Sequence, residues 1–181
     1  TIYGATYLVL APEHPLLNSI VLPENIEAVK SYIESAKVKT EIERMSVDRN
    51  KTGVFTGSYA VNPINKAEIP IWVADYVVSS YGTGAIMAVP SGDERDFEFA
   101  KTFNLPIIEV VSNDGKEHGN DECFSNYGIS VNSGEYSGKS TEKVQQLINA
   151  KLDEMGCGGA KIQYKLHDWL ISRQRYWGTP I

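Results

Sequence analysis

The feature that most constrains this chain is residues 81–100, where a glycine-bearing turn, a short apolar run, a tight loop and a helix start follow one another. The apolar run at 85–89 predicts a short buried strand, and Pro-Ser-Gly after it predicts the loop. Asp93 stands at the N-cap position, with Asp96 three residues later, a variant of the capping box. The strand therefore ends at a helix N-terminus, where backbone N–H groups and a carboxylate point into one concavity.

Two interpretations of Asp93 and Asp96 stay open at this point. The simpler is that both only start a helix, as most such pairs do. The other is a ligand site, which the small residues Gly82, Gly84 and Gly92 favour because they let a ligand approach the backbone closely. The helix dipole favours a charged aspartate in the first turn, so the pKa of Asp96 should be low. A low pKa makes Asp96 a poor general base and a good anchor for a cation such as a substrate ammonium.

The rest of the chain alternates irregularly between predicted strands and helices. Apolar and β-branched runs predict further strands at 3–11, 54–61, 68–78, 107–111, 129–131 and 161–166. Apolar spacing predicts helices at 24–45, from Asp93 to about Phe103, and from Ser140 or Thr141 to Gly156. Residues 62–65 predict a hairpin turn, and the polar residues 116–126 a mobile loop. We expect a mixed α/β fold with a barrel-like, largely antiparallel β core and surrounding helices.

Composition and charge argue against several classes of protein. The sequence contains no apolar run of about 18 residues or more, so no membrane span is expected. The net charge of −6 argues against strong binding of nucleic acid by this chain alone. Cys123 and Cys157 lack metal-ligand spacing, and so do the histidines. We therefore expect free thiols, no metal site, and a cytoplasmic or alternatively an organellar location.

Residues 168–181 carry a resemblance to a known family. Their sequence, Asp-Trp-Leu-Ile-Ser-Arg-Gln-Arg-Tyr-Trp-Gly-Thr-Pro-Ile, resembles the strand by which an inserted editing domain re-enters the catalytic domain of class I aminoacyl-tRNA synthetases for branched aliphatic amino acids. Tyr176 and Thr179 favour the leucyl-tRNA synthetase family over its isoleucine and valine relatives. Stretches similar to the bacterial or organellar form of this family occur at 1–15, 39–44, 51–55 and 81–96.

The resemblance implies an editing domain over residues 1–166 and a re-entry strand over 167–181, toward a catalytic domain. Such a domain hydrolyses the ester that joins a wrong amino acid (norvaline, isoleucine or methionine) to the terminal adenosine of leucine tRNA, and spares leucine. A second site is needed because one methylene in an apolar pocket discriminates by only about 1–3 kcal/mol. The expected partners are the 3′ end of leucine tRNA and the catalytic domain of a parent enzyme, which would use ATP and Mg. For this chain we expect no cofactor and a monomer.

The resemblance also assigns roles to individual residues. Thr1 falls on the threonine that blocks the leucine side chain, a role that suits a short, stiff, β-branched residue. Asp96 falls on the aspartate that binds the α-ammonium of the substrate. The surrounding pocket aligns with Val78, Tyr81, Ile86, Met87, Val89 and Asp93. For the apolar members of this set, a place in the ordinary core is an equal alternative.

Two departures from the family pattern lead to alternative functions. Ser91 and Gly92 stand where many relatives carry a small residue and a histidine, so no histidine base is expected here. The threonines that precede Thr1 in the family, and hold the adenosine and the attacking water, are not in this sequence. We therefore expect the isolated chain to be weakly active or inactive. The alternatives are a non-catalytic insertion that positions the tRNA end, and an editing domain of the isoleucine or valine enzyme.

Overall fold

The computed structural model describes residues 1–39, 44, 51–79 and 82–160. The predicted strand at 161–166, the re-entry strand at 167–181 and Tyr81 lie outside the described residues, as does most of the predicted helix extension toward residue 45. In the described part no helix is long and apolar enough to span a membrane.

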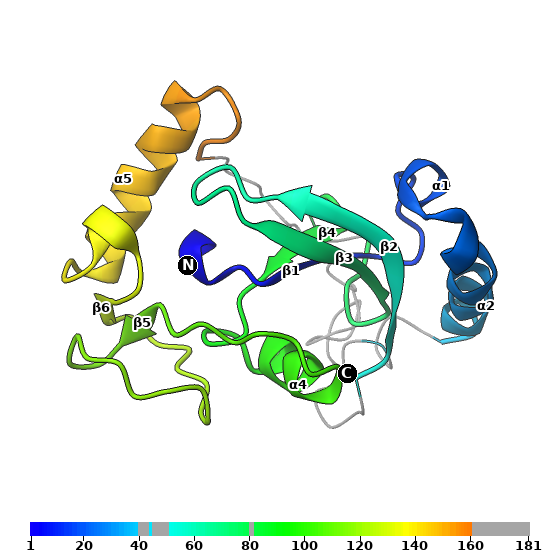
Figure 1. The fold of residues 1–181 in the computed structure, drawn as a ribbon, viewed down its shortest axis with the longest axis horizontal. Coiled ribbons are helices and arrows are strands. Elements are labelled where there is room, and N and C mark those ends of the chain that lie inside the picture. The colour runs from blue at the N-terminus through cyan, green and yellow to red at the C-terminus, as the bar shows by residue number, and fades with distance from the viewer. Residues whose placement is uncertain (40–43, 45–50, 80–81, 161–181) are drawn as a thin grey trace, which may run out of the picture.

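A four-stranded sheet forms the centre of the molecule (Figure 1). Its strands are β1 (Tyr7–Leu10), β2 (Gly53–Val61), β3 (Glu68–Ala74) and β4 (Ala85–Ala88). The order is β2-β3-β1-β4, with β1 parallel to β3 and antiparallel to β4. The predicted hairpin is confirmed, because β2 and β3 pair antiparallel with Val61 opposite Glu68.

The mixed α/β class is confirmed, but the barrel-like core is wrong for the residues that the structure describes. Here the sheet is open, with β2 and β4 at its two edges, and its central pair is parallel. Hydrophobic patterns predict that a segment is a strand without fixing its neighbour in the sheet. Between β1 and β3, the described part of the chain includes α1, α2 and the first arm of the hairpin, a connection long enough for β3 to run parallel to β1.

The two faces of the sheet bury different helices. Along β3, Trp72 and Ala74 belong to one apolar cluster, whereas Ile71 and Val73 belong to another, as the two-residue period of a strand requires. Helix α4 (Glu94–Thr102) covers the first face through Phe99. Helices α1 (Leu17–Ile20) and α2 (Ile26–Lys37), preceded by the turn η2 (Pro23–Asn25), cover the second. The result is a helix–sheet–helix arrangement.

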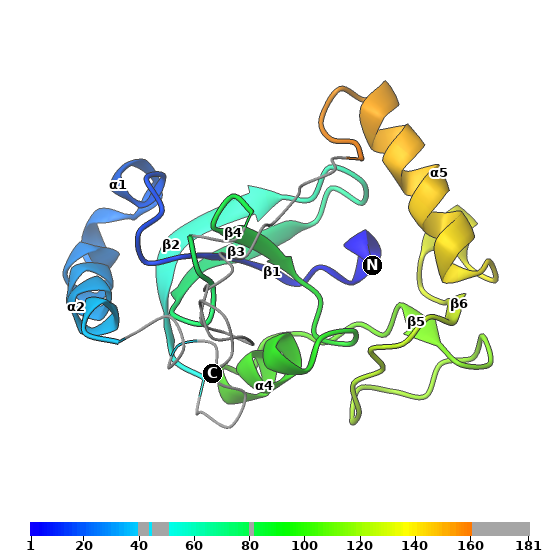
Figure 2. The same ribbon diagram turned by 180° about the vertical axis from the view of Figure 1, so that it is seen from behind.

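A smaller unit lies beside this arrangement. It contains β5 (Val111–Ser112), β6 (Ile129–Ser130), the turn η3 (Gly134–Tyr136) and α5 (Thr141–Glu154). The strand predicted at 107–111 is shorter than expected, because only its last residue pairs with β6. Ile2 and Tyr3 of the N-terminal turn η1 (Ile2–Gly4) pack against the apolar stripe of α5. Figures 1 and 2 both show this turn between α5 and the four-stranded sheet.

Candidate functional site

The start of α4 has the cap that the sequence predicts. The carboxylate of Asp93 accepts hydrogen bonds from the backbone N–H groups of Arg95, at 2.9 Å, and Asp96, at 3.3 Å. It also pairs with the guanidinium of Arg95 at 3.0 Å. Partial burial raises the pKa of Asp93, but the Arg95 guanidinium and the two N–H groups outweigh it and hold the pKa below its ordinary value. Asp93 is therefore a charged cap at neutral pH.

Asp96 lies inside the molecule rather than on its surface. Its side chain belongs to a residue only 5% exposed. One carboxylate oxygen, Oδ1, accepts a hydrogen bond from the hydroxyl of Tyr76, and the other, Oδ2, accepts one from the backbone N–H of Val89, both at 2.9 Å. The hydroxyl of Tyr7 donates to the backbone carbonyl of Asp96, also at 2.9 Å. Asp96 thus joins α4 to β1, to the end of β4 and to the segment after β3.

The expected low pKa of Asp96 is wrong. Burial raises it to about 6, and the negative charge of Asp93 adds to the rise. The hydrogen bonds from Val89 and Tyr76 and the charge of Arg95 oppose the rise without cancelling it. The position of Asp96 in the sequence indicates only the helix dipole, which favours the charged form. Desolvation has the larger effect on the pKa, and it depends on what the fold packs around the carboxylate.

Thr1 and Met87 meet in one cavity. Its volume is about 220 Å³. The walls come from η1, β4, the small sheet and α5: Thr1, Ile2, Met87, Val111, Ser130, Thr141, Val144, Gln145, Ile148, Asn149 and Leu152. This lining is mostly apolar, with the amides of Gln145 and Asn149 one helical turn apart. Such a pocket suits a small aliphatic side chain with a polar group at one side.

The other predicted pocket residues that the structure describes do not line this cavity. Ile86 packs against the cluster that contains Tyr7 and Phe99, on the sheet face opposite Met87, so it is a core residue. Val89 is buried in a further cluster, and Val78 is also buried. Asp96 does not line the Thr1–Met87 cavity, but it holds the backbone of the residue two positions after Met87.

Sequence reasoning missed two features of this region. The sequence suggested no site on α5, whereas Val144, Ile148 and Leu152 of its apolar stripe line the cavity. The amides at positions 145 and 149, beside that stripe, were the available signal. Tyr76 was also missed, since nothing in its apolar surroundings along the sequence distinguishes it from a core aromatic residue.

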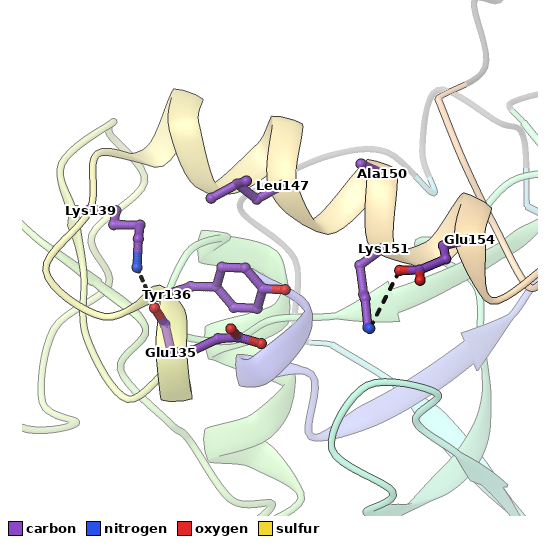
Figure 3. A pocket seen from close by; sticks show the side chains of 7 residues that line it. All are labelled: Glu135, Tyr136, Lys139, Leu147, Ala150, Lys151 and Glu154. Carbon is purple, nitrogen blue, oxygen red and sulfur yellow. Dashed lines mark hydrogen bonds and ion pairs between the residues drawn. The ribbon is translucent and has the colours of Figure 1, made fainter.

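A second hollow lies along α5 and has a different character (Figure 3). It measures about 280 Å³, with Tyr136, Leu147 and Ala150 among its lining residues. Its two lysines are engaged locally: Lys139 donates to the backbone carbonyl of Glu135, and Lys151 pairs with Glu154 at 3.5 Å. These charges balance within the hollow, so it offers no net positive field for a phosphate.

The described residues show no group of three or more His, Cys, Asp or Glu that could hold a metal ion. Both cysteines are free thiols, Cys123 half-buried and Cys157 exposed. Burial, followed by the charges of Asp93, Glu94 and Asp96, raises the pKa of Cys123 to about 11, so this thiol is no nucleophile at neutral pH.

The family follows from comparison with known proteins. Residues 1–153 match the family model described as the leucyl-tRNA synthetase editing domain. The chain belongs to this family of editing domains. It is 54% identical over 182 residues to the leucine--tRNA ligase of Clostridium perfringens (strain 13 / Type A), covering 100% of this chain and 22% of the ligase. It is 53% identical over 186 residues to that of Rhodopirellula baltica, covering 99% and 20%.

A solved structure agrees with this assignment. The editing domain resembles a chain in the ternary complex of Agrobacterium radiobacter K84 agnB2 LeuRS with tRNA and LeuAMS, with a TM-score of 0.66 and 36% identity. The match covers 98% of this chain and 19% of that chain. The editing domain thus spans about a fifth of the length of the ligases that it matches.

Proposed function

We propose that this editing domain hydrolyses the ester of wrongly charged leucine tRNA and spares the ester of leucine. The observation that carries the proposal is the cavity shared by Thr1 and Met87 in a chain of this family. Water adds to the ester carbonyl, the bond to the ribose oxygen of the terminal adenosine breaks, and the free amino acid leaves. The wrong amino acids in view are norvaline, isoleucine and methionine.

The cavity supports selection by exclusion. Thr1 lines the cavity with a β-branched side chain, which has few rotamers and yields little space. A leucine side chain, with two methyl groups on Cγ, overlaps such a wall, whereas the side chains of norvaline and isoleucine, which do not branch at Cγ, pass it. Overlap discriminates more sharply than the loss of a contact could. Tyr81 belongs to the same proposed pocket and lies outside the described residues.

Asp96 supplies the proposed anchor for the α-ammonium. With a pKa of about 6 its carboxylate is mostly ionised at neutral pH. Each of its oxygens accepts one hydrogen bond from the protein, which leaves lone pairs for an ammonium donor. The proposal assigns Asp96 to the ammonium and no side chain to the role of general base, so the proposed rate enhancement rests on positioning of water and ester.

The proposed deacylation needs the rest of a leucine--tRNA ligase to bring the tRNA 3′ end to this domain. The net charge of −6 gives this domain little attraction for RNA, so the catalytic domain and the rest of a ligase would deliver the tRNA 3′ end. Activation of leucine, with ATP and Mg, is assigned to those other parts.

The test compares two tRNA esters and two proteins. Norvalyl- and leucyl-tRNA for leucine are purified separately and added to a full-length leucine--tRNA ligase that carries this chain as its editing domain. We expect loss of the norvaline ester at least about 100-fold faster than loss of the leucine ester, the range that a site with repulsive exclusion reaches. Asp96→Asn, which keeps the shape and removes the charge, should slow norvaline release at least about tenfold.

Asp153→Asn is the matched control. It removes an exposed carboxylate of α5 and should leave deacylation unchanged. Equal deacylation by the parent protein and Asp96→Asn would remove the ammonium role of Asp96. Loss of neither ester would favour a non-catalytic insertion that only positions the tRNA end.

A further inference from the structure

Tyr76 has a place in this site that its sequence context does not reveal. It follows β3 by two residues and is only 6% exposed. Its ring packs against Phe99 of α4 with 5.6 Å between ring centroids, so packing sets the position of its hydroxyl. That hydroxyl donates to Oδ1 of Asp96 at 2.9 Å. A residue from the end of one strand is therefore aimed at the carboxylate that faces it from the first turn of α4.

The two hydrogen bonds on Asp96 differ in how they depend on sequence. The bond to Oδ2 comes from the backbone N–H of Val89, which any residue except proline would supply. The bond to Oδ1 comes from a side chain, and it disappears if Tyr76 becomes phenylalanine. Together the two bonds orient the carboxylate through both of its oxygens. Only the bond from Tyr76 depends on which side chain the sequence places there.

We propose that Tyr76 is a positioning residue for deacylation, whose hydroxyl holds the carboxylate of Asp96 in the orientation and the charged form that receive the substrate ammonium. This inference rests on the function proposed above. Tyr76 itself does not touch the reacting atoms in this proposal; it acts through Asp96.

The electrostatic surroundings support this role. Among the described residues, the titratable and charged groups around Asp96 are Asp93 and Arg95 on its own helix, Tyr7 on β1, Tyr76 after β3, and Cys123 in the loop beyond β5. Burial, with Tyr7 and Asp96 nearby, raises the pKa of Tyr76 far above its ordinary value, so its hydroxyl remains a neutral donor. A donor to the charged form lowers the pKa of a carboxyl group, so loss of the hydroxyl should raise the pKa of Asp96 above about 6.

The experiment measures norvalyl-tRNA deacylation between about pH 5 and pH 8.5 in a full-length ligase that carries this chain. A hydrogen bond to a charged group corresponds to a shift of about one pKa unit. Tyr76→Phe should therefore move the acid limb of the rate profile upward by about one unit, which is roughly a fivefold loss near pH 6 and less than about 1.2-fold near pH 8. Stronger donation should do the reverse, so Tyr76→3,5-difluorotyrosine should move the limb downward.

Tyr7→Phe is the matched control. It removes a hydroxyl from the same buried cluster, but one that donates to the backbone carbonyl of Asp96 rather than to its carboxylate. It should cost stability and, because the Tyr7 hydroxyl also interacts with the Tyr76 hydroxyl, it should move the acid limb less than Tyr76→Phe does. Circular dichroism at each pH records the folded fraction of every variant.

Two results would overturn the proposal. One is a uniform loss of rate in Tyr76→Phe at every pH, because a merely structural role lowers activity without moving the limb. The other is an unmoved limb in the difluorotyrosine variant, which keeps the native shape and so remains informative even if Tyr76→Phe fails to fold. Failure of the proposed function is seen separately: there Asp96→Asn itself would deacylate norvalyl-tRNA like the parent protein.

Discussion

Helices α4 and α5 contribute to the proposed site by different means. Helix α4 contributes a polar cluster, in which Asp93 caps the helix and Asp96 receives donors from two other segments. Helix α5 contributes an apolar stripe that lines the Thr1–Met87 cavity, and the hydroxyl of its N-cap residue, Ser140, makes no capping bond. The α4 side depends on satisfied hydrogen bonds, which fix direction. The α5 side depends on shape, which sets what fits.

The largest loss of stability should come from removing the carboxylate of Asp96 from the polar cluster at α4. Asp96→Ala leaves the N–H of Val89 and the hydroxyl of Tyr76 buried without their acceptor. Each unsatisfied buried donor costs about 1–3 kcal/mol, so the free energy of unfolding should fall by about 4 kcal/mol. Urea denaturation measures it, with the exposed Asp153→Ala as the control that should change little. A loss below about 1 kcal/mol would mean that water replaces the carboxylate and the cluster is not structural.

Truncating a side chain of the α5 stripe should act by enlarging the cavity. Ile148 is buried on α5 and lines the cavity, so Ile148→Ala should lower the free energy of unfolding by about 3 kcal/mol. The same change enlarges the cavity and should let the leucine ester be hydrolysed more readily, while the pH profile stays in place. The exposed Lys143→Ala on the same helix serves as the control. A cavity variant that slowed both esters equally would assign Ile148 to stability alone.

The pH dependence of stability distinguishes the two sides further. The pKa of Asp96 is about 6 in the folded protein against an ordinary value of 3.8, so between these values the folded state binds more protons than the unfolded state. The contribution of Asp96 to stability is therefore present at low pH and is lost as pH rises from about 4 to 6, by at most about 3 kcal/mol. The difference in unfolding free energy between the parent protein and Asp96→Asn should shrink over that window. A difference that grows with pH would mean a lowered pKa in the folded state.

The smallest effect concerns the caps. Asp93→Ala removes two capping bonds and should cost about 1 kcal/mol. Ser140→Ala should cost close to nothing, because Ser140 makes no capping bond and the next residue, Thr141, instead exchanges hydrogen bonds with Gly128 at 3.0 Å. Thermal melts of the two variants make the comparison. Equal losses would show that Ser140 caps α5 in solution.

The sequence by itself determined the local features of this protein. The N-cap at Asp93, the end of α4 near Phe103, the hairpin of β2 and β3 and the apolar stripe of α5 all follow from residues within a few positions of one another. The resemblance of the sequence to leucyl-tRNA synthetase editing domains also led to the family, which the comparisons confirm.

Only the tertiary structure decided how those features meet. Whether the sheet closes depends on which strands pair, and a period of two residues carries no information about the partner. Whether Ile86 or Met87 faces the cavity depends on which side of the sheet α5 occupies. The pKa of Asp96 depends on burial in the folded protein, where Asp96 meets Tyr7 and Tyr76, which are distant from it along the chain. Desolvation and packing depend on residues that are distant along the chain and come together only in the folded protein.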